Sequence, residues 1–176
     1  MLMPGTRARP AARRAGRGFT LIELMVTVAV LAVGLALAAP SLSTQIANYR
    51  LRGAAEGVIN GLNYARAEAV RRNSNVSFTL DAGGAGWTVA QVSPATTLQT
   101  RANAEAPGVT AASTTASLAV TFTPTGLVDT SGVRLGQVNL STAVSGAETR
   151  RIDIFGGGLI RVCNPSITTA GDPRRC

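Results

Sequence analysis

The first pattern along this chain is an unbroken apolar segment near its beginning. Residues 19–39 carry one charged side chain, Glu23, and are otherwise apolar, small or hydroxylic. As a helix this segment would span roughly 30 Å, about the thickness of the hydrocarbon core of a bilayer. The preceding residues hold five arginines and no acid: Arg7, Arg9, Arg13, Arg14 and Arg17. This charge asymmetry predicts a single-pass membrane anchor whose N-terminus is cytoplasmic, with residues 40–176 on the other side.

A second, helical period follows the anchor. Apolar side chains recur at alternating steps of four and three residues, at Leu51, Ala55, Val58, Leu62, Ala65 and Ala69. This stripe predicts that the helix continues from Ser41 to Arg72, ends at 73–75, and carries a Glu68–Arg72 ion pair. Pro40 lacks a backbone donor, so we expect a kink or a melted turn there.

Glycines form another row on this helix, at Gly53, Gly57 and Gly61. Each costs about 1 kcal/mol of helix stability relative to alanine. Two interpretations remain open. The row lets a sheet or a neighbouring helix approach closely, or it marks a slack helix of small residues.

Beyond residue 75 the period changes to two, which is typical of strands. Residues 76–80 and 87–89 predict a hairpin with a loop over 81–86, and residues 118–122 predict a strand that stops at a turn over 124–126. Residues 133–135 and 138–140 are out of phase across Gly136, which favours a bulge. Residues 152–154 and 159–163 predict two more strands. Residues 93–117 hold few large apolar side chains and predict a long loop, either mobile or a surface extension. The expected fold class is α+β: one long N-terminal helix, its first half transmembrane, packed on an antiparallel β-sheet domain.

Glu23 is costly inside the apolar segment unless its carboxylate finds a partner. No cation lies within residues 19–39. If the chain were cut after Gly18, Phe19 would expose an α-amine at the membrane edge. The amine of a neighbouring copy could then pair with Glu23, one helical turn further along. We therefore expect Glu23 to act between subunits of an assembly.

Composition excludes most enzymatic functions. The 176-residue chain has a formal charge of +8, which falls to +3 from Phe19 onward, and it contains no histidine. Imidazole proton transfer, histidine nucleophile systems and histidine-ligated metals are therefore excluded. The carboxylates are scattered, and the glycine clusters match no phosphate-binding spacing. We predict no catalytic residue, no cofactor and no metal. Cys163 and Cys176 lie on the oxidising side of the membrane and predict a disulfide.

Three simpler interpretations of the N-terminus were weighed. An ordinary secretory signal could be cleaved near residues 36–38, but its apolar core would be too long and would contain Glu23. Arg13 and Arg14 could suggest a twin-arginine signal, but such a pair arises easily in an arginine-rich tract. A plain anchor that never assembles leaves the Glu23 carboxylate unexplained.

The sequence GFTLIELM, followed by the apolar segment and Pro40, resembles the class III signal of type IV pilins and type II secretion pseudopilins. The resemblance implies that prepilin peptidase cuts after Gly18, that Phe19 is N-methylated, that Glu23 is the assembly glutamate and that Pro40 is the helix-loosening proline. It also implies an inner-membrane protein with a periplasmic domain, which joins other pilin or pseudopilin subunits in a pilus or pseudopilus.

The segments 51–72 and 75–80, the turn at 122–126 and the stretch 151–163 resemble the GspH/FimT branch of this group. That resemblance implies a non-enzymatic subunit at or near the tip of a type II secretion pseudopilus or a type IV pilus, which supports filament assembly and protein secretion. The C-terminal cysteine pair favours the type IV pilus.

Some FimT-like pilins bind DNA during uptake through a Gly-Arg-x-Arg motif. The corresponding residues here are 158–161, where leucine replaces the first arginine and Arg161 remains. Arg174 and Arg175 could supply phosphate contacts in its place, because such contacts need charge rather than a fixed motif. The alternative, which we favour, is a solvated basic tail.

Overall fold

The computed structural model describes residues 18–176, so the arginine-rich leader lies outside the described residues. The helix α1 (Leu21–Arg72) is followed by eight strands and a short 3₁₀ turn. The chain divides into two compact units, one ending at Ala39 and the other beginning at Pro40. The backbone is helical through position 40. Of the two outcomes expected there, a kink or a melted turn, the melted turn is not formed, and the helix continues past the missing backbone donor of Pro40.

The first unit is the apolar beginning of α1. Leu21–Ala39 has a mean hydropathy of 2.5, and no residue of it is buried. Its large side chains are exposed, for example Leu31 at 63% and Leu37 at 77%. By length and composition this helix could cross a membrane, as the sequence predicts.

In the second unit, the predicted stripe of α1 is the helix's contribution to the core. Leu51, Ala55, Val58, Leu62, Ala65 and Ala69 are all at most 4% exposed. The helix ends as predicted. Asn73 adopts a left-handed conformation (φ 49°), and the N–H of Ser74 donates to the carbonyl of Ala69 at 3.2 Å. This is a Schellman motif, which satisfies carbonyls left free at the helix end.

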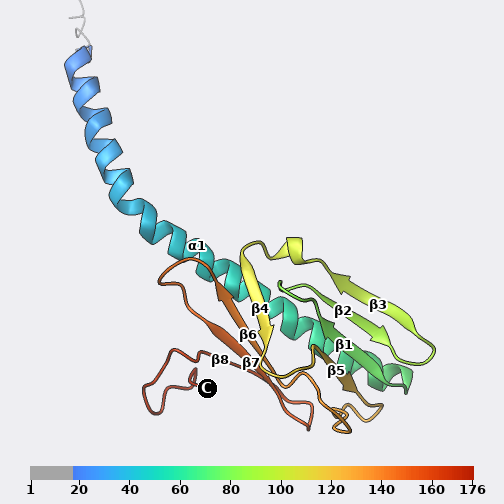
Figure 1. Ribbon diagram of the computed structural model, residues 1–176. Helices are drawn as coiled ribbons and strands as arrows, with labels where there is room; N and C mark the ends of the chain where they lie inside the picture. Colours follow the sequence, from blue (N-terminus) through green and yellow to red (C-terminus); the bar gives the residue numbers. More distant parts are fainter. Residues whose placement is uncertain (1–17) are drawn as a thin grey trace, which may run out of the picture. The chain divides into compact units, whose positions relative to one another are not determined.

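Two four-stranded antiparallel sheets pack against this part of α1 (Figure 1). The first has the order β3-β2-β1-β5 and the second β4-β6-β7-β8. The strands are β1 (Val76–Leu80), β2 (Trp87–Gln91), β3 (Thr96–Arg101), β4 (Val109–Ser113), β5 (Ala119–Phe122), β6 (Gln137–Thr142), β7 (Arg150–Ile154) and β8 (Ile160–Cys163). The predicted hairpin is confirmed as β1 and β2, whose register pairs Phe78 with Val89. The antiparallel α+β class is confirmed as well.

The prediction of a long loop over 93–117 is wrong. This segment contains β3, the 3₁₀ turn Asn103–Glu105 and β4. Both strands lie at sheet edges, and β3 is mostly exposed. An edge strand needs few large apolar side chains, so its Thr- and Ala-rich sequence gave no alternating signal.

A strand over 133–135 is not formed either. These residues belong to an irregular connector between β5 and β6, in which Leu135 is buried and Val133 is 74% exposed. The connector bonds to both sheets. The N–H of Asp129 donates to the Thr121 carbonyl on β5 at 2.9 Å, and the N–H of Ile154 on β7 donates to the Gly136 carbonyl of the connector at 2.8 Å. Its backbone groups are thus paired without regular strand geometry.

The glycine row has two different environments. A Cβ on Gly61 would lie 2.7 Å from the Trp87 ring and 2.9 Å from Phe78, and Gly57 faces the Arg101 guanidinium. A Cβ on Gly53 would meet nothing within 4 Å. Close approach of the first sheet therefore explains Gly57 and Gly61, and it does not explain Gly53.

Candidate functional site

The processing and assembly residues predicted from the sequence lie at the start of α1. Gly18 and Phe19 precede the helix, and the Phe19 side chain is 85% exposed. Glu23 lies in the first helical turn and is exposed. A carboxylate there is favoured by the positive end of the helix dipole. The exposed segment thus presents one acid and a continuous apolar surface.

Thr20 caps this helix, a role that the sequence reasoning missed. Its Oγ1 accepts a hydrogen bond from the backbone N–H of Glu23 at 3.2 Å. The signal was present as Thr-x-x-Glu ahead of an apolar run, the pattern of a capping box. The cap fixes Glu23 at the third position of the helix.

The C-terminal cysteines are joined, as predicted. The Cys163–Cys176 disulfide links the end of β8 to the last residue of the sequence. The intervening tail also returns to the strand, because the N–H of Asn164 donates to the Arg174 carbonyl at 2.6 Å and Asn164 bridges Arg175 in parallel. The disulfide and these bonds hold residues 164–176 against the second sheet.

Two of the three arginines named for nucleic-acid contact lie together, Arg161 and Arg175, whereas Arg174 lines a groove beside α1. Nη2 of Arg161 donates to the Arg175 carbonyl at 2.7 Å. Arg174 is exposed, and its Nη2 lies 2.8 Å from Asp172 Oδ2. Hydrogen bonds from the Arg174 side chain, and then from its backbone N–H, lower the pKa of Asp172 to about 2. The tail is therefore a basic loop with an internal ion pair.

An ionic cluster around the buried Glu68 lies at the C-terminal end of α1. Glu68 is 7% exposed and receives Arg71 Nη2 and Arg72 Nε, each at 2.6 Å from Oε2. The predicted Glu68–Arg72 pair is confirmed, with Arg71 as an additional partner. Hydrogen bonds from Arg71 and then Arg72 lower the pKa of Glu68 to about 2. The cluster anchors the last turn of the helix, where cations are also favoured by the helix dipole.

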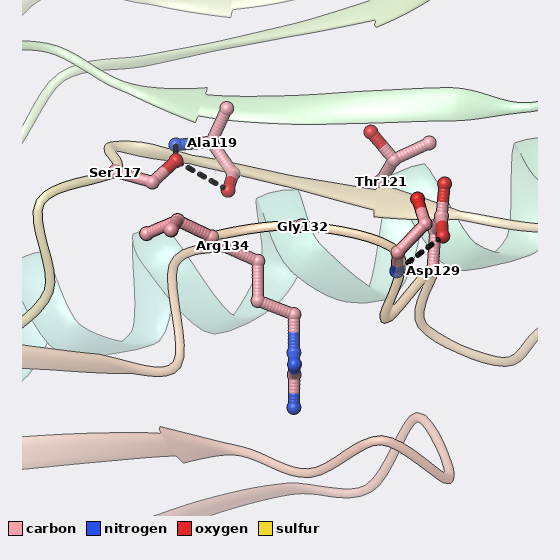
Figure 2. Close-up of a pocket in the computed structure, with 8 residues that line it drawn as sticks. Ser117, Ala119, Thr121, Asp129, Gly132 and Arg134 are labelled. Atoms are coloured by element: carbon pink, nitrogen blue, oxygen red, sulfur yellow. Dashed lines mark hydrogen bonds between the residues drawn. The ribbon is translucent and has the colours of Figure 1, made fainter.

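A polar hollow of about 190 Å³ lies between β5 and the connector (Figure 2). Ser117 bonds to the backbone of Ala119, and Asp129 accepts the Ser131 N–H at 2.9 Å. The bonds from Ser131, chiefly from its backbone, lower the pKa of Asp129. Figure 2 shows the Arg134 side chain pointing away from Ser117 and Ala119. In this hollow, Ser117 and Asp129 bond to backbone groups two residues away in their own loops. These local bonds do not pair a nucleophile with a base.

Comparison with known proteins assigns most of the chain. Residues 54–158 match the family model described as Type II transport protein GspH, and residues 13–39 match the prokaryotic N-terminal methylation motif. A curated relative, Type II secretion system protein H of Xanthomonas campestris pv. campestris, is 33% identical over 81 residues. These are 46% of this chain and 48% of the relative. The chain thus spans about half the length of the curated relative that it matches.

Solved structures of the type IV minor pilin FimU of Pseudomonas aeruginosa PAO1 share the fold. One has a TM-score of 0.53 at 23% identity and covers 68% of this chain and 95% of FimU. A second crystal form gives 0.51 at 22% identity, covering 68% and 100%. The fold is therefore type IV pilin-like. The family model covers more than half of the chain, follows the methylation motif and describes structural, non-enzymatic subunits, so this chain belongs to the GspH family of pseudopilins.

Proposed function

We propose that this protein is a minor subunit of a type II secretion pseudopilus, incorporated at or near the tip, which supports filament assembly and protein secretion. Residues 1–18 form a leader that prepilin peptidase removes after Gly18, and Phe19 becomes the N-methylated first residue. Residues 19–39 anchor the chain in the inner membrane before assembly and pack into the filament afterwards. Residues 40–176 form the periplasmic domain.

The observation that carries this proposal is the fully exposed apolar helix with its single acid. Apolar side chains along Leu21–Ala39 have no cover within the described chain. A lipid bilayer or the helices of other subunits would cover them. The Glu23 carboxylate would be costly in either environment without a cation, and the α-amine of Phe19 from a neighbouring subunit supplies one.

Substitution of Glu23 tests the proposal. Glu23→Ala is expected to remain in the membrane fraction and to be lost from filaments sheared from the cell surface. Thr27→Ala is the matched control, because Thr27 lies one turn further along the same exposed helix and its hydroxyl donates to the Leu24 carbonyl of that helix. Normal incorporation of Glu23→Ala would contradict the proposal. So would a mature N-terminus at Ala39 by mass spectrometry.

The choice of the secretion system rests on the family. Both the family model and the curated relative carry type II secretion descriptions. These two descriptions outweigh the cysteine pair, which favours the type IV pilus on sequence grounds. The likeness to FimU concerns the fold alone. Deletion of the gene is therefore expected to reduce secretion of folded exoproteins and to leave twitching motility intact. The reverse result would assign the subunit to a type IV pilus.

A second candidate function is DNA binding during uptake. It is favoured by the contact between Arg161 and Arg175 and by the exposure of Arg174, the residue before Arg175 in the chain. Phosphate contacts predict salt-sensitive affinity of the purified protein for duplex DNA, lost when Arg161, Arg174 and Arg175 become alanine. A flat gel-shift titration of the wild-type protein would exclude this function.

A further inference from the structure

We propose that the groove between α1 and β8 binds an extended acidic segment of a partner protein, which adds to the second sheet as a strand beside β8. This inference goes beyond filament assembly. It concerns a surface of the second unit, and it can be measured on the dispersed, unassembled chain. Its failure would therefore leave the proposed assembly role untouched.

The outer edge of β8 offers backbone groups for such a strand. β8 is the last strand of its sheet, and it pairs with β7 on one side. The N–H of Asn164 faces outward, where it donates to Arg174. Because backbone groups alternate between the two edges of a strand, those of Ile160 and Val162 face outward too. Among the described residues, the tail bridges this edge only at Asn164 and Arg175, so the edge continues beyond the tail.

The space beside this edge accommodates side chains. A groove of about 450 Å³ runs between α1 and β8. Ala55, Ile59 and Val162 line it with small or branched apolar side chains, and Ile59 and Val162 are only partly buried. A strand added to β8 would alternate its side chains between this groove and the outer face of the sheet.

Guanidinium groups flank the edge on both faces. In the groove, Arg52 and Arg174 have side chains 53% and 71% exposed. On the other face, Arg161 and Arg175 are exposed. Arg150 also lines the groove, and its Nη2 lies 2.7 Å from Glu148, the same carboxylate that Arg52 approaches only to 3.9 Å.

These arginines determine the chemistry of the occupant. Glu56 is the one carboxylate among the residues that line the groove. Arg174 already holds Asp172 through Nε and Nη2, but this pair is exposed, so a ligand carboxylate can replace Asp172 at little cost. Exposed guanidinium groups bind carboxylates well, often through two parallel hydrogen bonds. An extended segment with alternating apolar and acidic residues complements both the edge and its charge, as in strand addition by peptide-binding domains.

The test uses the full chain dispersed in detergent and a fluorescent, capped peptide of alternating valine and glutamate. The acidic peptide is expected to bind, with affinity that falls as salt rises, and a matched peptide with lysine in place of glutamate is expected not to bind. Val162→Pro removes the outward N–H and should weaken binding about fivefold or more relative to Val162→Ala, which keeps the N–H and trims the same side chain. The double variant Arg52→Ala with Arg174→Ala should weaken it about tenfold or more.

Several results would overturn the proposal. They are equal binding of the acidic and lysine peptides, equal affinity of Val162→Pro and Val162→Ala, and undiminished binding after loss of the two arginines. If Val162→Pro fails to fold by circular dichroism, an acidic peptide N-methylated at alternate amides replaces it and must lose affinity. Duplex DNA bound through the same arginines, with no binding of the acidic peptide, would assign this surface to nucleic acid instead.

Discussion

The backbone N–H of Glu23 donates to the side-chain oxygen of Thr20, so the acid proposed to act in assembly and the helix cap are one local unit. The cap satisfies a donor that the first helical turn leaves free, at the end of the segment proposed to enter the membrane. Glu23 thereby has a defined position relative to Phe19. An intersubunit pair between the α-amine and the carboxylate depends on that position.

Thr20→Ala is expected to loosen the start of α1. Loss of an N-cap costs about 1 kcal/mol, so the amides of residues 21–24 should exchange with solvent faster in micelles. Thr20→Ser keeps the hydroxyl and serves as the control. If Thr20→Ala and wild type exchange at the same rate, the cap does not stabilise the helix start.

The Glu68 cluster predicts a loss of stability in acid. The pKa of Glu68 is lowered from 4.5 to about 2 in the folded chain, so its contribution is complete above pH 4.5 and is lost as the pH falls toward 2. Urea unfolding of wild type should therefore show a midpoint that decreases across this range. Asp172 contributes in the same direction, since its pKa is lowered too.

Glu68→Gln isolates the contribution of this residue. The variant should be less stable than wild type at neutral pH, and the difference should shrink toward pH 2, where wild-type Glu68 is protonated. Glu56→Gln changes an exposed carboxylate on the same helix and is the control. A stability difference that is independent of pH would show that the Arg71 and Arg72 contacts do not act through charge.

Strong periodicity made much of this fold predictable. The stripe from Leu51 to Ala69 and the alternation through Val76 and Phe78 reflect burial on one face, which sequence alone records. β3 and β4 were not predicted, because an edge strand is specified by the strand with which it pairs. β3 pairs with β2 across a register shift between Val89 and Ala90, and no local pattern encodes that pairing.

The candidate sites divide in the same way. Gly18, Phe19 and Glu23 belong to a contiguous motif and were named from the sequence. The groove beside β8 could not be predicted from the sequence. Arg52 on α1 and Arg174 in the tail line the same groove only because the folded sheet packs on the helix. At Val133 and Leu135 the sequence predicted a strand that the structure does not contain. Their alternation predicted a strand, yet an irregular connector buries Leu135 equally well.

Two glycines of one row should respond oppositely to alanine. Gly61→Ala places a Cβ against Trp87 and Phe78 and should destabilise the fold by about 1–3 kcal/mol. Gly53→Ala meets open space and should stabilise the helix by about 0.5–1 kcal/mol. Thermal unfolding of both variants measures the two effects. If Gly53→Ala lowered the stability of the fold and Gly61→Ala did not, the packing of the first sheet on α1 would be contradicted.

The disulfide should stabilise both the whole fold and the tail, and two measurements separate these global and local effects. Joining residues 13 apart is expected to contribute about 3 kcal/mol to the free energy of unfolding in the chain-entropy model. Cys176→Ser should therefore lower the urea midpoint and expose the bonds after Arg174 and Arg175 to trypsin.

The remaining bonds of the tail, from Asn164 to Arg174 and from Arg161 to Arg175, are too few to hold it. Cleavage at Arg71 and Arg72 is the internal control, because the Glu68 cluster should protect those sites in both proteins. A tail that resists trypsin equally with and without the disulfide would show that hydrogen bonds alone keep it on β8.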